Sequence, residues 1–304
     1  MTETTYDYMY EVTRDASGNL SVASGSPSDT MVGVNSNENV LNAGDEIYIN
    51  GGTVSGLNGD YDYVGSIEHG SGFLVYNVAN QNFYMLTNSE FSSGSLGSLT
   101  SSGNGSQDPQ CFAAGTGILT STGEVKVEDL KVGYPVLTAD GRSAWIRWIG
   151  RQTVLRAFAD ETSLPVRIGA GALDENVPRN DLLVSERHAL FVDGVLIQAG
   201  ALVNGTTIVR ERDVPSKFVF YHIELDDHSL VLAENTPAET FVDNVDRARF
   251  DNWHEYEALY PMGKSIEEMP YARAKSARQV PAVIRAKLAE RAARMQVTDM
   301  VSAA

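Results

Sequence analysis

The sequence predicts a mainly β protein with a small N-terminal β domain, a second all-β body and a helical C-terminal tail. Three observations lead to this prediction. Short apolar and aromatic runs alternate with Gly, Asn and Asp turns over residues 1–91 and again over 111–245. A Ser/Gly-rich tract, 92–110, separates the two β regions. In the tail, 246–304, the apolar spacing becomes helical.

The composition indicates a globular protein with an uneven charge. The 304 residues carry a formal net charge of −17, and 42% of them are hydrophobic, which is enough to bury real cores. Residues 1–110 hold thirteen acidic residues and one basic residue, whereas 261–304 hold eight basic and four acidic residues. This acidity disfavours nucleic acid and anionic membranes as partners of the whole molecule.

The sequence contains neither a membrane span nor a Sec signal peptide that we can identify. No apolar run approaches the roughly 18 residues that a spanning helix needs, and the first residues have no basic and apolar regions. We therefore expect no transmembrane segment. A signal-less bacterial export route through the C-terminal end is compatible with this composition, so we expect a secreted or cell-surface protein that is cytoplasmic before export.

The N-terminal region, 1–91, has the turn spacing of a small sandwich or barrel. Its Asn and Asp residues lie in turn clusters such as Asn58-Gly59-Asp60, and they form no calcium-loop pattern, so we expect no metal site. The clearest predicted strands are 45–50, 61–67 and 73–78.

The tract 92–110 is a flexible linker by composition, and it ends directly before the only cysteine, Cys111. A peptide bond at the end of such a linker is expected to be accessible without any unfolding. One cysteine forms no intramolecular disulfide, so this thiol is either a small buried hydrophobe or a reactive group.

The body, 111–245, is predicted to be a compact all-β domain. Two hairpin dipeptides, Asp140-Gly141 and Asp193-Gly194, separate short strands. The predicted strands are 125–127, 135–138, 144–149, 182–185, 190–192, 195–197, 218–225 and 230–233.

The tail contains one amphipathic helix that begins after Pro281. We expect it to pack on the domain or to bind a partner rather than to lie on a membrane, because the whole chain is acidic. Its apolar residues at helical spacing are Val283, Ile284, Leu288, Ala292 and Met295.

Four stretches of the body occur in an order that resembles a known family. They are CFAAGTGILTSTGEVKVEDLKVGYPVLTADG, WIRWIG, NDLLVSERHALFVDGVLIQAGALVNGTTI and YHIELDDHSLVLAENTPAETF. Residues 111–245 thereby resemble a Hint domain, the horseshoe-like hedgehog/intein autoprocessing fold, of the bacterial Hint_2-like subgroup that ends secreted or surface proteins. The resemblance implies a single-turnover, cysteine-dependent domain that cleaves its own chain.

The resemblance assigns roles to three residues around the bond between Gln110 and Cys111. The Cys111 thiolate would add to the Gln110 carbonyl and convert the amide into a thioester. His188, in the family's Thr-x-x-His motif, would protonate the leaving amide nitrogen. Ser185 replaces the threonine of that motif; it keeps the hydroxyl that holds the amide, so we expect slower chemistry.

Two further histidines lie near the end of the body. His228 stands where inteins carry the histidine of a late β-hairpin, and Asp226 or Asp227 beside it would act as a base or orient the imidazole. With regular strand alternation, His222 and His228 share one face, so both are expected to point into the site. For all four residues, a structural role remains an equal alternative.

The chain departs from the splicing pattern of inteins. Asn235 follows His228 too closely, and Val245, after Asn244, is no nucleophile. We therefore expect cleavage without splicing, in which the N-terminal segment is the substrate and water or a small nucleophile is the acceptor. No cofactor, metal or sterol is implied.

Two other functions stay open. The body is an inactive Hint scaffold in a secreted or surface structural or adhesive protein, or it is a cysteine protease that acts on other chains through Cys111, His188 and an aspartate. The last is the weakest reading, because residue 110 already occupies the space in front of the thiol.

Overall fold

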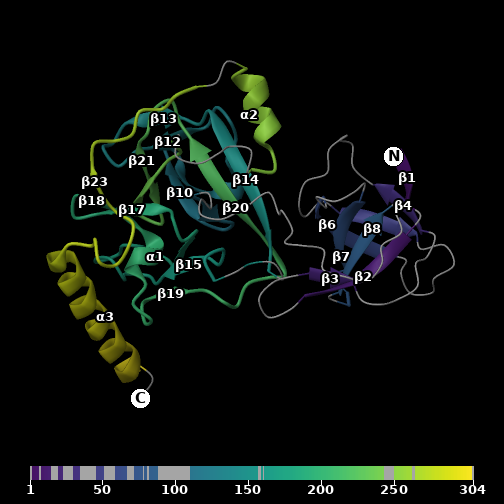
Figure 1. Cartoon of the computed structure of the whole chain (residues 1–304). Coiled ribbons are helices and arrows are strands. Elements are labelled where there is room, and N and C mark those ends of the chain that lie inside the picture. Colours follow the sequence, from purple (N-terminus) through teal and green to yellow (C-terminus); the bar gives the residue numbers. More distant parts are fainter. Residues whose placement is uncertain are drawn as a thin grey trace. The chain divides into compact units, whose positions relative to one another are not determined.

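The structure is a computed structural model, and the chain forms two compact units in it (Figure 1). The first comprises Met1–Ser106 and Thr153–Phe158, and the second comprises Gln107–Gln152 and Ala159–Ala304. Of the predicted linker 92–110, only Gln110 lies within the described residues. The structure describes residues 2–6, 8–14, 20–22, 30–34, 46–50, 59–66, 72–77, 79–80, 82–87, 110–156, 159, 161–242, 250–261 and 264–302.

The described part of the first unit is one eight-stranded antiparallel sheet, in the order β1-β4-β5-β6-β7-β8-β2-β3. The three predicted strands are confirmed as β5, β6 and β7, within two residues at each end. The five other strands were not among the predicted ranges. The strands are β1 (Thr2–Tyr6), β2 (Tyr8–Arg14), β3 (Leu20–Val22), β4 (Thr30–Val34), β5 (Glu46–Asn50), β6 (Gly59–Ser66), β7 (Gly72–Asn77) and β8 (Asn82–Thr87).

Aromatic and aliphatic side chains of β2, β6, β7 and β8 form the core of the first unit. Leu155, from the segment Thr153–Phe158 that clusters with this unit, packs into the same core. The β7–β8 hairpin closes through Asn77, whose Oδ1 accepts the N–H groups of Ala79 and Asn80 at 2.9 and 3.2 Å. This side-chain turn explains why an Asn-rich sequence connects two buried strands.

The described part of the second unit contains two sheets, and all their strands except β23 come from the body, 111–245. One has nine strands among the described residues, in the order β13-β12-β10-β21-β22-β17-β18-β23 with β11 paired to β10; the other has the order β14-β20-β9-β16-β15-β19. Their strands are β9 (Phe112–Ala113), β10 (Gly117–Thr120), β11 (Gly123–Lys126), β12 (Pro135–Leu137), β13 (Ser143–Trp145), β14 (Trp148–Leu155), β15 (Val166–Ile168), β16 (Leu182–Val184), β17 (Ala189–Val192), β18 (Val195–Gln198), β19 (Ile208–Arg210), β20 (Lys217–Glu224), β21 (Leu230–Ala233), β22 (Thr236–Glu239) and β23 (Ala272–Ala274).

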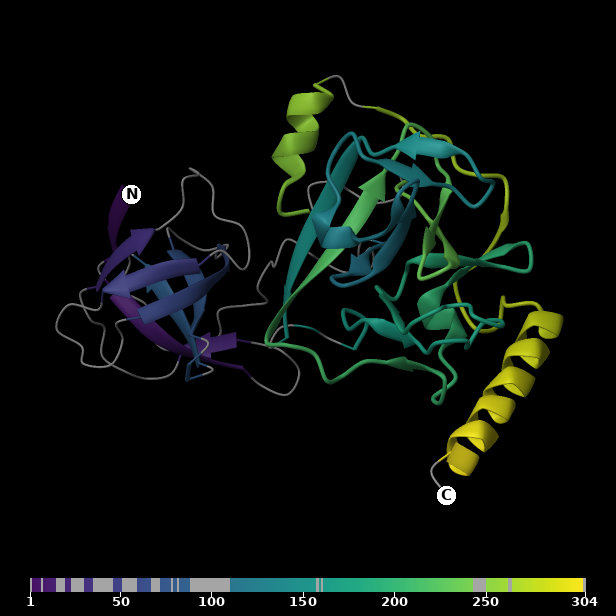
Figure 2. The same ribbon diagram turned by 180° about the vertical axis from the view of Figure 1, so that it is seen from behind.

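The prediction of a mainly β protein is confirmed, but the predicted strand 144–149 is wrong. Residues 144–149 are not one strand: β13 ends at Trp145 and β14 begins at Trp148. The Ile146 N–H donates to Tyr134 O, whereas the Arg147 N–H donates to Glu224 O. The chain therefore leaves one sheet and enters the other at this point, which a mostly apolar run of six residues does not reveal. Both views show β14 and β20 side by side (Figure 1, Figure 2).

Two tight hairpins use residues with positive φ. Asp193 and Gly194 have φ of 46° and 88° between β17 and β18, which confirms this predicted turn. Glu234 and Asn235, with φ of 47° and 65°, form the same kind of two-residue turn between β21 and β22, and this turn was not predicted because it has no glycine. Asn235 is thus a turn residue inside the domain.

The C-terminal region adds α2 (Trp253–Leu259), β23 and α3 (Ala282–Ser302), and a short helix, α1 (Ala199–Leu202), follows β18. The predicted amphipathic helix is confirmed as α3, which Figure 1 shows in yellow. The largest hydrophobic cluster of the second unit, which we call the main core, includes Phe112 and Val184. Ile284 and Leu288 of α3 belong to this main core. Val283 is 75% exposed, so the buried face of α3 is narrower than predicted. No helix within the described residues is long and apolar enough to cross a membrane.

Candidate active site

Cys111 lies in the interior of the second unit, one residue before β9. This short strand is held on both sides, because Phe112 pairs with Val184 of β16 and with Tyr221 of β20. Cys111 is 0% exposed and Gln110 is 5% exposed. The expectation of an accessible peptide bond at the linker's end is therefore wrong: the pairing of β9 draws the bond between these two residues into the core.

Ser185 forms two hydrogen bonds with the backbone of Cys111. The Cys111 N–H donates to Ser185 Oγ at 2.8 Å, and the Ser185 N–H donates to Cys111 O at 2.9 Å. The β9–β16 pairing places Ser185 there, since Ser185 directly follows Val184. The hydroxyl thus contacts the nitrogen of the predicted scissile bond, as the motif comparison implied.

His188 is fully buried beside the same strand. Its ring centroid lies 4.3 Å from that of Phe112, and its backbone N–H donates to Ser185 O at 3.1 Å. His188 Nε2 lies 3.0 Å from Glu239 O. A carbonyl oxygen only accepts, so we assign the proton of the neutral ring to Nε2 and the lone pair to Nδ1. Among the described residues, Nδ1 has no hydrogen-bond partner.

Burial lowers the pKa of His188, because a charged imidazolium is poorly solvated in the core. The negative charge of Glu239 opposes this effect, and so do the backbone groups of Cys111 and Glu239 near the ring. A histidine with a lowered pKa releases its proton readily once it is protonated. The arrangement can therefore deliver a proton to a backbone group of Cys111.

The sequence reasoning missed Glu239, a fully buried carboxylate on β22. Its Oε1 accepts the Ala189 N–H at 3.0 Å, and its Oε2 accepts Arg273 Nη2 at 2.6 Å. Burial raises the pKa of Glu239, but the nearby His228 ring and the hydrogen bond from Arg273 outweigh burial, so the pKa lies below its usual value. A single Glu in an alternating strand carries no motif, and Arg273 lies 34 residues away in sequence.

His228 is buried next to Glu239. The Met269 N–H donates to its Nδ1 at 2.9 Å, so the ring proton lies on Nε2, which is 3.4 Å from Glu239 Oε2. The face-sharing argument for His222 and His228 does not apply, because β20 ends at Glu224 and His228 lies in the following loop. His222 does approach His188: their ring centroids are 5.8 Å apart and nearly perpendicular.

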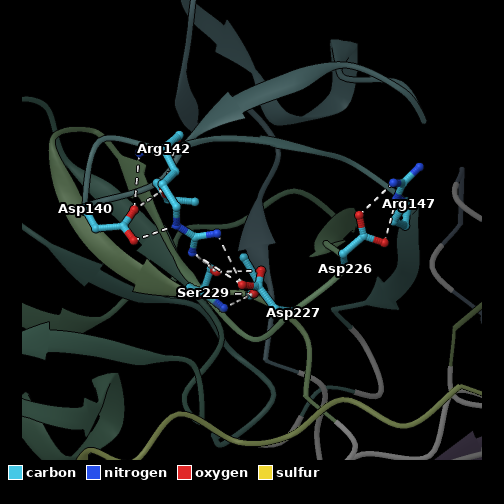
Figure 3. Close-up of polar contacts among 8 residues, drawn as sticks. Asp140, Arg142, Arg147, Asp226, Asp227 and Ser229 are labelled. Carbon is cyan, nitrogen blue, oxygen red and sulfur yellow. Dashed lines mark hydrogen bonds and ion pairs between the residues drawn. The ribbon is translucent and has the colours of Figure 1, made fainter.

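Asp226 and Asp227 lie at the surface, with 61% and 54% of their side chains exposed (Figure 3). Asp226 accepts two hydrogen bonds from Arg147, at 2.6 and 2.8 Å. Asp227 accepts bonds from Arg142 at 3.3 Å and from Ser229 at 2.8 Å. Among the contacts of the described residues, the carboxylate that approaches His228 is therefore Glu239, and neither aspartate orients this imidazole.

The described residues hold no group of three or more His, Cys, Asp and Glu side chains that could bind a metal ion. What they bring together is a hydroxyl on the Cys111 amide, the Cys111 thiol beside that amide, and the His188 imidazole packed against Phe112, the next residue. These three groups come from the residue before β9 and from the turn after β16, and β9 and β16 are neighbours in the six-stranded sheet. Nucleophilic attack on the amide and protonation of its nitrogen are the steps that such a set can perform.

Comparison with known proteins identifies the body. Residues 110–245 match the family model of the Hint domain. No curated protein matches the sequence. Among solved structures, the chain is similar to an intein-like bacterial domain from Clostridium thermocellum (20% identity, 44% of this chain and 100% of that chain, TM-score 0.33). It is also similar to the MchDnaB-1 intein with the substitution N145AA (17%, 43% and 99%, TM-score 0.32) and to the gp41-1 intein (12%, 43% and 98%, TM-score 0.32). Residues 110–245 of this chain are a Hint domain, a fold of the autoprocessing type.

Proposed function

We propose that this Hint domain cleaves its own chain between Gln110 and Cys111. The observation that carries the proposal is the hydrogen bond from the Cys111 N–H to Ser185 Oγ, 2.8 Å long, with the His188 ring packed against Phe112. Nucleophile, amide and proton donor are thus held by neighbouring backbone segments. A bond between adjacent residues needs no substrate to bind, because proximity is already built into the chain.

The first step transfers the acyl group from nitrogen to sulfur. The Cys111 thiol gives its proton to the lone pair on His188 Nδ1, and Sγ adds to the carbonyl carbon of Gln110. The carbon–nitrogen bond then breaks as protonated His188 gives a proton to the nitrogen of Cys111, which leaves a thioester and a free amine. Ser185 Oγ holds that nitrogen throughout, and it accepts a hydrogen bond more strongly as the nitrogen becomes positively charged.

The second step releases the N-terminal segment. Water, or a small thiol, amine or alcohol, adds to the thioester carbonyl, and the Cys111 thiol leaves with a proton. Because Gln110 and Cys111 are buried, the acceptor must be small enough to enter the core near β9. No splicing follows, since Asn235 lies in the β21–β22 turn, where its Nδ2 donates to Asn176 O at 3.0 Å and it is not placed as a terminal asparagine.

Intact-mass spectrometry of freshly purified protein, incubated with and without a small thiol, tests the proposal. We expect two fragments of about 12 and 21 kDa, which is 33.0 kDa divided in proportion to 110 and 194 residues. Cys111→Ala should give no fragments, whereas Ser143→Ala, on the exposed edge strand β13, should cleave like the wild type. A single stable 33.0 kDa species under both conditions would contradict the proposal and leave the domain as a scaffold.

A further inference from the structure

The segment after the family-matched residues is part of the same fold. β23 pairs in parallel with β18, and Ala274 belongs to the main core. Ile266 is also buried, and Val280 belongs to the main core together with Ile284 of α3. Residues 264–288 therefore complete the second unit, although they lie beyond the matched range 110–245.

This segment places one guanidinium next to the buried Glu239. Arg273, on β23, has a side chain that is only 15% exposed, and its Nη2 binds Glu239 Oε2 at 2.6 Å. Its Nε also forms an ion pair with Glu268. An ionised carboxylate with no exposure needs such a partner, because removal of one member of a buried pair leaves an uncompensated charge.

Glu239 in turn contacts both the His188 ring and the peptide group that follows it. Its backbone oxygen accepts the hydrogen bond from His188 Nε2 at 3.0 Å, and its Oε1 accepts the N–H of the next residue, Ala189, at 3.0 Å. The ring and the backbone of the proton donor therefore both depend on where Glu239 lies. A continuous series of contacts runs from Arg273 through Glu239 to His188.

We propose that Arg273 is a positioning residue for the reaction at Cys111, and that residues 264–288 must dock before cleavage can occur. The inference rests on the proposed function. It also goes beyond it, because it makes the reaction depend on a segment outside the matched Hint range. Since this segment is synthesised after residues 110–245, the site is complete only when residues 264–288 have also been made and folded.

The charged and titratable groups around His188 determine what a substitution should do. Glu239 faces it from β22, His222 from β20 and Cys111 from the residue before β9, while His228 and Arg273 act through Glu239. Loss of the guanidinium leaves the Glu239 charge less compensated, so the pKa of His188 should rise. Replacing Glu239 by glutamine removes that charge, so the pKa of His188 should fall.

The test uses full-length chains that carry Arg273→Met, Arg273→Lys or, as the matched control, Arg278→Met on an exposed residue of the same segment. We expect Arg273→Met to cleave at least about tenfold more slowly, Arg273→Lys to recover part of the rate because it keeps the charge, and the control to match the wild type. The rate is measured by intact mass from pH 6 to 8. Wild-type cleavage by folded Arg273→Met, or no recovery by Arg273→Lys, would overturn the proposal.

A second measurement separates this proposal from the proposed function. In the Cys111→Ala background, NMR titration of the His188 imidazole, assigned with His188→Gln, should give a higher pKa for Arg273→Met and a lower one for Glu239→Gln. If neither substitution moves the pKa of His188, the positioning role is wrong. If the wild-type chain never cleaves, the proposed function fails, and this titration still decides whether Arg273 acts on His188. Glu239→Gln also serves if Arg273→Met does not fold.

Discussion

Replacing Ser185 by alanine removes the acceptor of the Cys111 N–H group and leaves this donor buried. An unsatisfied buried donor costs about 1–3 kcal/mol of folding free energy. The effect on cleavage depends on how the hydrogen bond changes along the reaction. A neutral hydrogen bond contributes about 0.5–1.5 kcal/mol and one to a charged group about 1.5–3 kcal/mol, so the bond strengthens by about 1–1.5 kcal/mol as the nitrogen is protonated.

This difference predicts the rate of the variant. At 1.36 kcal/mol for each factor of ten, loss of about 1–1.5 kcal/mol should slow cleavage of Ser185→Ala by roughly 5- to 15-fold. The assay starts cleavage with a small thiol, quenches samples over time and fits the loss of the 33.0 kDa species by intact mass. Ser143→Ala, exposed on β13, is the control for loss of a hydroxyl elsewhere in the domain.

Folding is checked in the same samples by urea denaturation followed through tryptophan fluorescence. All three tryptophans, Trp145, Trp148 and Trp253, lie in the second unit, so the signal reports the unit that holds Ser185. The reasoning would be refuted if folded Ser185→Ala cleaved at the wild-type rate, or if the control slowed as much. It would also be refuted if the variant lost stability but no rate, because the hydroxyl would then serve the fold alone.

Two further outcomes follow from the site. Burial lowers the pKa of His188 below its unfolded value of about 6.5, so the unfolded chain binds more protons below that pH and the stability of the second unit should fall on acidification. The urea midpoint should therefore decrease between pH 7 and 5, and it should decrease less for His188→Gln. An equal decrease of the midpoint in the two proteins would contradict this. Asp227→Asn should change the cleavage rate by less than about threefold, because Asp227 forms exposed contacts with Arg142 and Ser229. A loss of cleavage rate as large as that of His188→Gln, measured by intact mass, would show that Asp227 takes part in the reaction.

Much of the candidate site could be predicted from the sequence, because its central residues lie in local motifs. Cys111 directly follows a Ser/Gly tract, and Ser185 and His188 are three residues apart, a spacing that the turn after β16 retains. Glu239 and Arg273 could not be predicted, since their contact joins β22 to a short strand 34 residues later. A local sequence pattern does not indicate which buried strand a distant side chain such as Arg273 will contact.

The same distinction holds for the fold. The sequence by itself determined the mainly β class, seven strands of the body, the Asp193-Gly194 turn and the amphipathic helix α3, because side-chain period and positive-φ residues act over a few neighbours. Only the tertiary structure decided that the bond after Gln110 is buried, that 144–149 crosses between two sheets, and that His228 contacts Glu239 rather than Asp227. These features depend on which distant strands pair and in which register, and pairing is determined by how the whole core packs.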